Sequence, residues 1–348
     1  PRISRIVAPW FAPRYVQGGV YEAIARHRAQ RLYGLVWESG SQDAPFHARH
    51  HQVIVSVGVP AAKAVSNEDL KQTRDGLIAM LKSLNLGVAE VEPQQLIAII
   101  DDLTSPTTAP QDDAVPYNPN DAIAAQAIRH DIELVIHEDR MRLVTEGFRA
   151  TGKIEDGVPE IGTVYPDAFD VRHFSSRNMP QRWAPWECAR LIGDMFTDKL
   201  RFPCPAATML CLVYPDQEAA SAKAGFKFMR TTSLAGTRSA RFLPRIGEQA
   251  AEWQHVQSEL QEGRRLVRVF YGLTTYSPLG RGDRDERAIK SIYKAAGWDL
   301  ADERYLQIQG LLAAMPMTLA DGLGADMERL KRFKTVLSTT AANIAPMQ

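Results

Sequence analysis

The chain has 348 residues, a length for which two domains are the usual expectation. Its 41 basic and 41 acidic side chains cancel, which disfavours a chain built wholly to bind nucleic acid but leaves room for a local basic patch. No apolar run reaches the ~20 residues of a membrane-spanning helix, and no signal-peptide pattern is present. Because the chain opens on Pro1 rather than Met, we expect a piece of a longer protein.

The cysteines indicate the redox compartment. Cys188, Cys204 and Cys211 lie inside apolar patterns and include no CxxC pair. This usage predicts reduced, buried thiols in a cytoplasmic protein rather than a disulfide framework.

Residues 1–34 predict an N-terminal arm followed by a short helix. Prolines in the arm argue against a long helix there. Its aromatic residues Trp10, Phe11 and Tyr15 are candidates for contact with a membrane surface or a partner protein. The alternative is that the arm packs on the core of its own domain.

Residues 35–162 predict a first α+β subdomain. Strands rich in Val and Ile are expected at 33–38, 52–59 and 87–91. A proline-rich surface loop is expected at 104–121, and strands 132–137 and 140–146 should form a β-hairpin.

Two helices are expected between these strands. Ser66 and Asp69 have the spacing of a capping box, so the first helix should begin there and end near residue 84. Its expected buried residues are Leu70, Leu77, Leu81 and Leu84. The second helix should run from Pro93 to about residue 103.

Residues 163–326 predict a second, more regular α/β subdomain. Its expected strands lie at 164–174, 208–214, 266–276 and 298–300, and its expected helices at 217–229, 248–262, 283–296 and 304–314. A further helix should follow Pro185, with an apolar stripe from Cys188 to Phe196. In the helix at 217–229, the residues expected to face inward are Ala219, Ala222, Phe226 and Met229.

The predicted fold class is therefore α+β (mixed α/β), a β-sheet layered with helices in two subdomains. Residues 327–348 predict an exit helix and a linker toward a further domain. No stretch fits a phosphate-binding P-loop, because the glycine clusters at 277–282 and 321–324 lack its Lys and hydroxyl residue. We therefore expect no P-loop domain, no catalytic residue and no cofactor-binding residue in this chain.

The sequence gives only weak signals for a metal site or a catalytic nucleophile. The spacing of His47, His50 and His51 fits no zinc site, so loop histidines are the better interpretation and no metal ligand is expected. Cys204 with His173 lacks a third orienting group, which favours a buried thiol. The pair at 101–102, two aspartates, is better explained as a helix end than as an acid/base dyad.

An irregular basic stretch at 230–247 contains the best candidate basic patch, formed by Arg230, Arg238, Arg241 and Arg245. A solvated face explains such a patch most simply. Contact with a polyanion or a partner is the alternative, and it leaves open a DNA-contacting module.

Four extended segments carry a resemblance to a known family: residues 77–106, ending in IIDDLTSP; 182–214, RWAPWECARLIGDMFTDKLRFPCPAATMLCLVY; 270–280, FYGLTTYSPLG; and 327–348, MERLKRFKTVLSTTAANIAPMQ. Together and in this order they resemble TraC-type ATPases of conjugative type IV secretion systems. The resemblance covers the part that precedes the ATPase domain in that family.

The resemblance implies a docking and oligomerisation domain of an ATPase for pilus assembly and DNA transfer, cytoplasmic and peripheral at the inner membrane. Expected partners are inner-membrane secretion components and further copies of the ATPase. ATP and Mg²⁺ are expected only in the C-terminal domain that this chain lacks. The alternatives are a DNA-contacting module through residues 230–245 and an independent enzyme with an unrecognised site.

Overall fold

The structure is a computed structural model that describes part of the chain. The described residues are 24, 35, 52–58, 65–104, 117–128, 132–145, 168–180, 183–184, 187, 190–191, 200–237, 244–319 and 322–344. Trp10, Phe11 and Tyr15, the three histidines of the HARHH stretch, Cys188, and most of the helix predicted after Pro185 lie outside these residues.

The fold is organised by a seven-stranded sheet in which every pair of strands is antiparallel. Its strand order is β1-β2-β3-β5-β4, with β6 beside β3 and β7 beside β5. The strands are β1 (Ile132–Ile136), β2 (Met141–Thr145), β3 (Ala168–Asn178), β4 (Ala206–Val213), β5 (Leu266–Pro278), β6 (Asp299–Asp302) and β7 (Lys334–Leu337).

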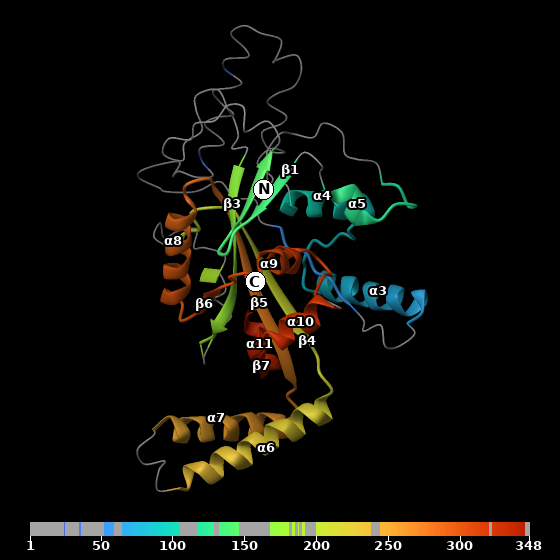
Figure 1. The fold of residues 1–348 in the computed structure, drawn as a ribbon. Coiled ribbons are helices and arrows are strands. Elements are labelled where there is room, and N and C mark those ends of the chain that lie inside the picture. The colour runs from blue at the N-terminus through green and yellow to red at the C-terminus, as the bar shows by residue number, and fades with distance from the viewer. Residues whose placement is uncertain are drawn as a thin grey trace.

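Helices surround this sheet, which confirms the α+β fold class (Figure 1). The described helices are α3 (Asn67–Ser83), α4 (Pro93–Thr104), α5 (Ile123–Ala127), α6 (Gln217–Ala235), α7 (Pro244–Gln261), α8 (Gly282–Ala295), α9 (Gln307–Ala314), α10 (Leu323–Arg329) and α11 (Ser338–Ile344). Within the described ranges, no helix combines the length and the apolar character that crossing a bilayer requires.

Strand β5 is central because its neighbouring residues contact helices on opposite faces of the sheet. Phe270 shares a core cluster with α9 and α10, whereas the Tyr271 ring packs at a tilt against Tyr293 of α8. Alternate residues of a strand point to opposite faces, so both faces of β5 are covered. This explains why apolar residues occupy consecutive positions of the strand, as in residues 269–271.

Helix α8 forms where the apolar periodicity predicts it. Ile289, Ile292 and Tyr293 are buried, as expected, and Gly297 closes the helix with a φ of 81°. Glycine adopts this left-handed conformation without the cost that a Cβ would impose. The helix carries the acidic side chains that meet the sheet, as described below.

The first region contains both confirmed and wrong predictions. The Ser66–Asp69 capping box, the helices α3 and α4, and the β1–β2 hairpin are confirmed. Residues 52–58 and 87–91, in contrast, lie in no strand, and Val53, Val55 and Val57 are exposed. High β propensity alone did not give these segments a pairing partner. In α3 only Leu81 of the four expected leucines is buried.

The sheet crosses the predicted boundary between the two subdomains. Strand β2 comes from the first predicted subdomain and pairs with β3 of the second, with Met141 opposite Val171. Strand β3 begins at Ala168, and residues 164–167 of the predicted strand lie outside the described residues. The division into subdomains stays a prediction.

The C-terminal segment differs from the exit helix and linker that the sequence predicts. Helix α10 ends at Arg329, β7 then pairs with β5, and α11 buries Ala341 and Ile344. Ala341 and Ile344 therefore contribute to the core, and the linker toward a further domain stays a prediction. Asn343 also donates a 3.2 Å hydrogen bond to the carbonyl oxygen of Trp183.

Candidate functional site

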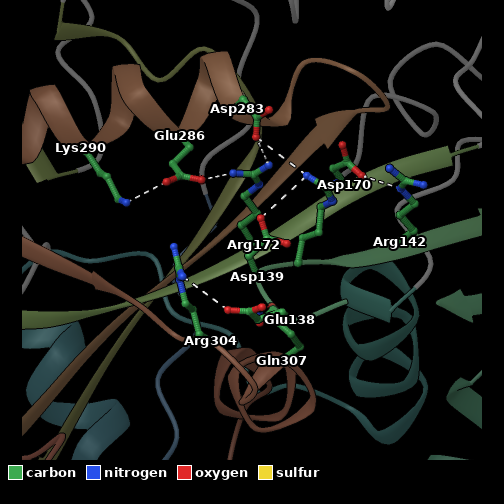
Figure 2. Close-up of polar contacts among 11 residues, drawn as sticks. Glu138, Asp139, Arg142, Asp170, Arg172, Asp283, Glu286, Lys290, Arg304 and Gln307 are labelled. Carbon is green, nitrogen blue, oxygen red and sulfur yellow. Dashed lines mark hydrogen bonds and ion pairs between the residues drawn. The ribbon is translucent and has the colours of Figure 1, made fainter. Parts of the chain in front are cut away.

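A network of charged side chains connects α8 to the sheet (Figure 2). At its centre Arg172 of β3 is 5% exposed and forms ion pairs with Asp283 and Glu286 of α8. Lys290, one helical turn further, pairs with Glu286 at 2.7 Å and with Asp302 of β6 at 2.6 Å. These contacts fix the helix against β3 and β6.

A second branch of the network fixes the β1–β2 hairpin. Arg142 of β2 pairs with the buried Asp170 of β3 at 3.1 Å, and Arg140 in the hairpin loop lies 3.9 Å from Asp283. The carbonyl oxygen of Glu138 accepts a 3.3 Å hydrogen bond from Gln307 of α9 (Figure 2). The loop therefore touches helices α8 and α9 as well as its own strands.

The chemistry of this network is structural. The hydrogen bond and charge of Arg172 lower the pKa of Asp283, so this carboxylate stays ionised at neutral pH. A general acid would need a raised pKa instead. Each carboxylate at the centre of the network faces an arginine, so the cluster holds α8 and β2 against β3.

Glu303 is the centre of a second polar cluster, which is buried. Its carboxylate accepts a hydrogen bond from Ser175 and pairs with Arg332, whose Nε lies 2.8 Å from Oε1. Arg332 follows α10 and Glu303 follows β6, so this pair holds the C-terminal segment beside the end of β6. The sequence pattern gave no signal for it, since the partners are 29 residues apart along the chain.

His173 lies beside this cluster and is only 3% exposed. Its Nδ1 is 2.9 Å from Oγ1 of Thr274, and burial lowers its pKa to about 3. Gly310 of α9 packs so closely on the imidazole that a Cβ there would overlap the ring. The imidazole is therefore neutral and shielded, which disfavours the pairing with Cys204 as base and nucleophile. Cys204 is itself fully buried.

The remaining sequence candidates are placed as follows. Asp101 and Asp102 lie in the last turn of α4, in line with the predicted helix end. In the described part of the chain, no group of three or more metal-ligating side chains comes together. Arg238 and Arg241 lie outside the described residues.

The predicted irregular stretch at 230–247 is wrong at both of its ends. Residues 230–235 form the last turns of α6, and residues 244–247 form the first turn of α7. Arg230 is an exposed residue of α6, whereas for Arg245 only its place in α7 is described. The described arginines of the candidate patch thus belong to two helices.

Helices α6 and α7 lie side by side at one end of the sheet, set apart from the other helices (Figure 1). Their contact joins Ala220 and Ala224 of α6 to Trp253, Val256 and Leu260 of α7. Small residues on one helix allow the bulky residues of the other to approach. Gln217 anchors the first turn of α6 to β5. Its side-chain oxygen accepts a hydrogen bond from the backbone N–H of Leu266, and its side-chain nitrogen donates one to the carbonyl oxygen of Leu266.

The outward face of α6 is the opposite of the predicted one. Ala219, Ala222, Phe226 and Met229 are all exposed, with Phe226 at 64% and Met229 at 61%. The periodicity was real, but the apolar stripe faces away from α7 because the alanines at 220 and 224 make the contact. We call α6 and α7 the α6–α7 hairpin, and this stripe its outward face.

Comparison with known proteins places this chain in a family. A family model described as TraC protein matches residues 1–319, which is most of the chain. The chain belongs to the TraC protein family. This confirms the resemblance, and three of the four segments that carried it lie within the matched residues.

A curated relative agrees with the TraC family. The chain is 21% identical over 316 residues to the protein named Protein TraC of Escherichia coli strain K12. The match covers 87% of this chain but 34% of that protein, so the chain spans about a third of the relative's length. The TraC family match includes the charged network and the α6–α7 hairpin, whereas Arg332, β7 and α11 lie beyond it.

Proposed function

We propose that this chain is the docking and oligomerisation part of a conjugative-transfer ATPase of the TraC family. Membership of the family supports the assignment to conjugative transfer, and the 34% coverage of TraC leaves room for a motor domain elsewhere in a longer protein. On this proposal ATP and Mg²⁺ act in that motor domain. The chain contributes binding surfaces instead of chemistry.

One observation carries the proposal: the α6–α7 hairpin projects from the sheet and exposes two large apolar side chains. Phe226 and Met229 lie one helical turn apart on the same side of α6, beside the exposed cations Lys223 and Arg230. Apolar side chains that cluster on a projecting element are typical of protein-binding surfaces. The charged network, by contrast, is occupied with contacts inside the chain.

The proposed location is the cytoplasmic face of the inner membrane, where the chain meets inner-membrane components of the secretion system. Trp10, Phe11 and Tyr15 are proposed to contact those components or the membrane surface. Trp and Tyr side chains combine an apolar body with a polar tip, which suits such boundaries, and Phe11 adds apolar surface. Deleting residues 1–18 should release the chain from the membrane fraction of cells that carry the transfer system. Unchanged association would remove the arm from the proposal.

Interference with transfer tests the proposed function. The chain, expressed alone in donor cells that carry the matching transfer system, should lower conjugation frequency because it occupies docking positions without a motor. F226D/M229D should interfere much less. The matched control L70D/M80D changes two exposed apolar residues of α3, 45% and 53% exposed, and should interfere like the unchanged chain. Transfer that is unaffected by the unchanged chain would contradict the proposal.

A second candidate function is DNA contact, which the exposed cations Lys223 and Arg230 of α6 favour. Binding through phosphates should weaken steeply as salt rises, because counterions are released on association. The readout is the affinity of the chain for a labelled duplex between 50 and 200 mM salt, roughly the range over which this effect is strong. Affinity that is absent at low salt, or unchanged in K223E/R230E, would dispose of this candidate.

A further inference from the structure

Strand β7 contributes to the core of the α6–α7 hairpin. Its last residue, Leu337, lies opposite Leu266 at the start of β5. Both leucines are buried with Ala224 of α6 in one apolar cluster, and Trp253 of α7 packs against this cluster. The cluster lies at the end of the sheet from which the hairpin projects (Figure 1). The hairpin therefore depends on a segment that is distant from it in the sequence.

Hydrogen bonds attach the hairpin and the end of β7 to adjacent residues. The backbone N–H of Ser338, which directly follows β7, donates a 2.8 Å hydrogen bond to the carbonyl oxygen of Arg265. The side chain of Gln217, the first residue of α6, bonds both backbone polar groups of Leu266. Residues 265 and 266 therefore hold the end of β7 and the start of α6 within one short stretch of backbone.

A row of side chains on one face of β5 connects this cluster to α10. Alternate residues of a strand share a face, so Leu266, Arg268 and Phe270 form a row. Arg268 makes an ion pair with Glu328 of α10, and Phe270 packs against Phe333 with ring centroids 5.7 Å apart. The segment that leads into β7 is thus attached to the face of β5 that carries the hairpin cluster. Chains of packed side chains can carry energetic coupling between elements.

Strand β7 has few backbone pairs. It contains four residues, Lys334–Leu337, and of the strands that the structure describes it pairs with β5 alone. Thr335 within the strand is exposed. Elements with few ordered backbone pairs open at a lower free energy than the long strands of a core sheet. We therefore expect β7 to open before β3 and β5 separate.

We infer that the pairing of β7 with β5 controls how firmly the α6–α7 hairpin is ordered. With β7 paired, Leu337 fills the base of the hairpin. With β7 unpaired, the cluster loses a buried leucine and the hairpin opens more often. The linkage is reciprocal, so a partner that orders the hairpin also favours the paired state of β7. This last point rests on the proposed function, because it takes the outward face of α6 as the surface that a partner binds.

Hydrogen exchange followed by mass spectrometry tests the coupling in the chain alone. T335P changes an exposed side chain but opposes the pairing of β7, because proline has a fixed φ and no N–H. It should speed amide exchange in α6 and α7 at least about tenfold. The matched control T335A leaves the backbone able to pair and should exchange like the unchanged chain. Strand β3 should keep its exchange rate in both variants, which checks that the sheet is folded.

The reverse perturbation starts in the hairpin. A224D places a charge in the apolar cluster and should speed exchange in β7 at least about tenfold. A222D introduces the same side chain at an exposed position of α6 and should leave β7 unchanged. Because this pair of variants does not alter β7 itself, it tests the coupling independently of how T335P folds.

Three results would overturn the inference: unchanged exchange of α6 and α7 in T335P, unchanged exchange of β7 in A224D, or a loss of protection in T335P that extends to β3. The exchange measurement needs no partner and no transfer system, so it is separate from the interference assay. Uncoupled exchange in a chain that still interferes with transfer would refute this inference and leave the proposed function standing. Coupled exchange in a chain that does not interfere would support the coupling and contradict the proposed function alone.

Discussion

His173 has an environment that its sequence position does not specify. The sequence disfavoured it as a base for Cys204, and the structure places it in the sheet beside Thr274 and under α9. Periodicity predicts that a residue lies in a strand. It cannot predict which helix will cover that residue from a distant part of the chain.

Burial of His173 predicts acid sensitivity. Its pKa is about 3 in the folded chain and 6.5 in the unfolded chain, so the unfolded state binds the proton in between. Stability should therefore be fully present above pH 6.5 and fall as the pH drops toward 3. Between pH 7.5 and 5.0 this amounts to about 2 kcal/mol.

Urea unfolding at these two pH values measures the effect. H173N should be less stable at pH 7.5 because it leaves a cavity, but its loss of stability on acidification should be about 2 kcal/mol smaller. Equal acid losses in the two proteins would show that His173 does not carry the effect.

Gly310 and Gly76 form a matched pair of glycines within helices. A Cβ at position 310 would overlap the His173 ring, whereas a Cβ at position 76 of α3 meets nothing within 4 Å. G310A should therefore destabilise the chain by about 1–3 kcal/mol, and G76A should stabilise it by about 0.4–1 kcal/mol. Thermal unfolding of both variants checks the opposite signs. A harmless G310A would contradict the close packing of α9 on β3.

Arg332 should be important for stability because Glu303 is buried. R332A leaves that carboxylate without its cation and should cost about 3 kcal/mol. The control R329A removes an arginine whose side chain is 81% exposed and should cost less than about 0.5 kcal/mol. Adding E303Q to R332A should recover part of the loss in chemical denaturation. If R332A and R329A cost the same, the pair does not hold the C-terminal segment.

At the scale of elements, sequence periodicity predicted where most helices and sheet strands of the second region lie. Periodicity failed where contact with a distant segment decides whether a strand forms or which face of a helix is buried. The valines at 52–58 have the pattern of a strand and lie in none, and the apolar stripe of α6 faces outward. In both cases the local pattern was correctly recognised, but the contact it implies is absent.

The exposed stripe of α6 gives a prediction at this scale. F226D/M229D should change the thermal midpoint little, because neither side chain packs on the core. Replacing Ala224, which is 3% exposed and faces α7, with Asp should melt the hairpin at a lower temperature than the rest of the chain. Differential scanning calorimetry of the two variants makes the comparison. A cooperative loss of stability in F226D/M229D would mean that the stripe is part of the core.

At the scale of the whole molecule, the sequence indicated the α+β class and the family, but not the single sheet. Strands β2 and β3 pair across the predicted boundary, and β7 returns to pair with β5. Pairing between distant segments depends on tertiary contacts, which short-range patterns do not encode. The candidate surface was likewise found by its exposure, since its residues read as core in the sequence.

The central claim is that this chain works through assembly and not through chemistry. The most direct measurement introduces F226D/M229D into the full-length transfer ATPase and records ATP hydrolysis and conjugation frequency together. The account predicts that hydrolysis is retained and that transfer falls sharply, while L70D/M80D changes neither. A variant that transfers normally, or one that loses hydrolysis and transfer in equal measure, would contradict it.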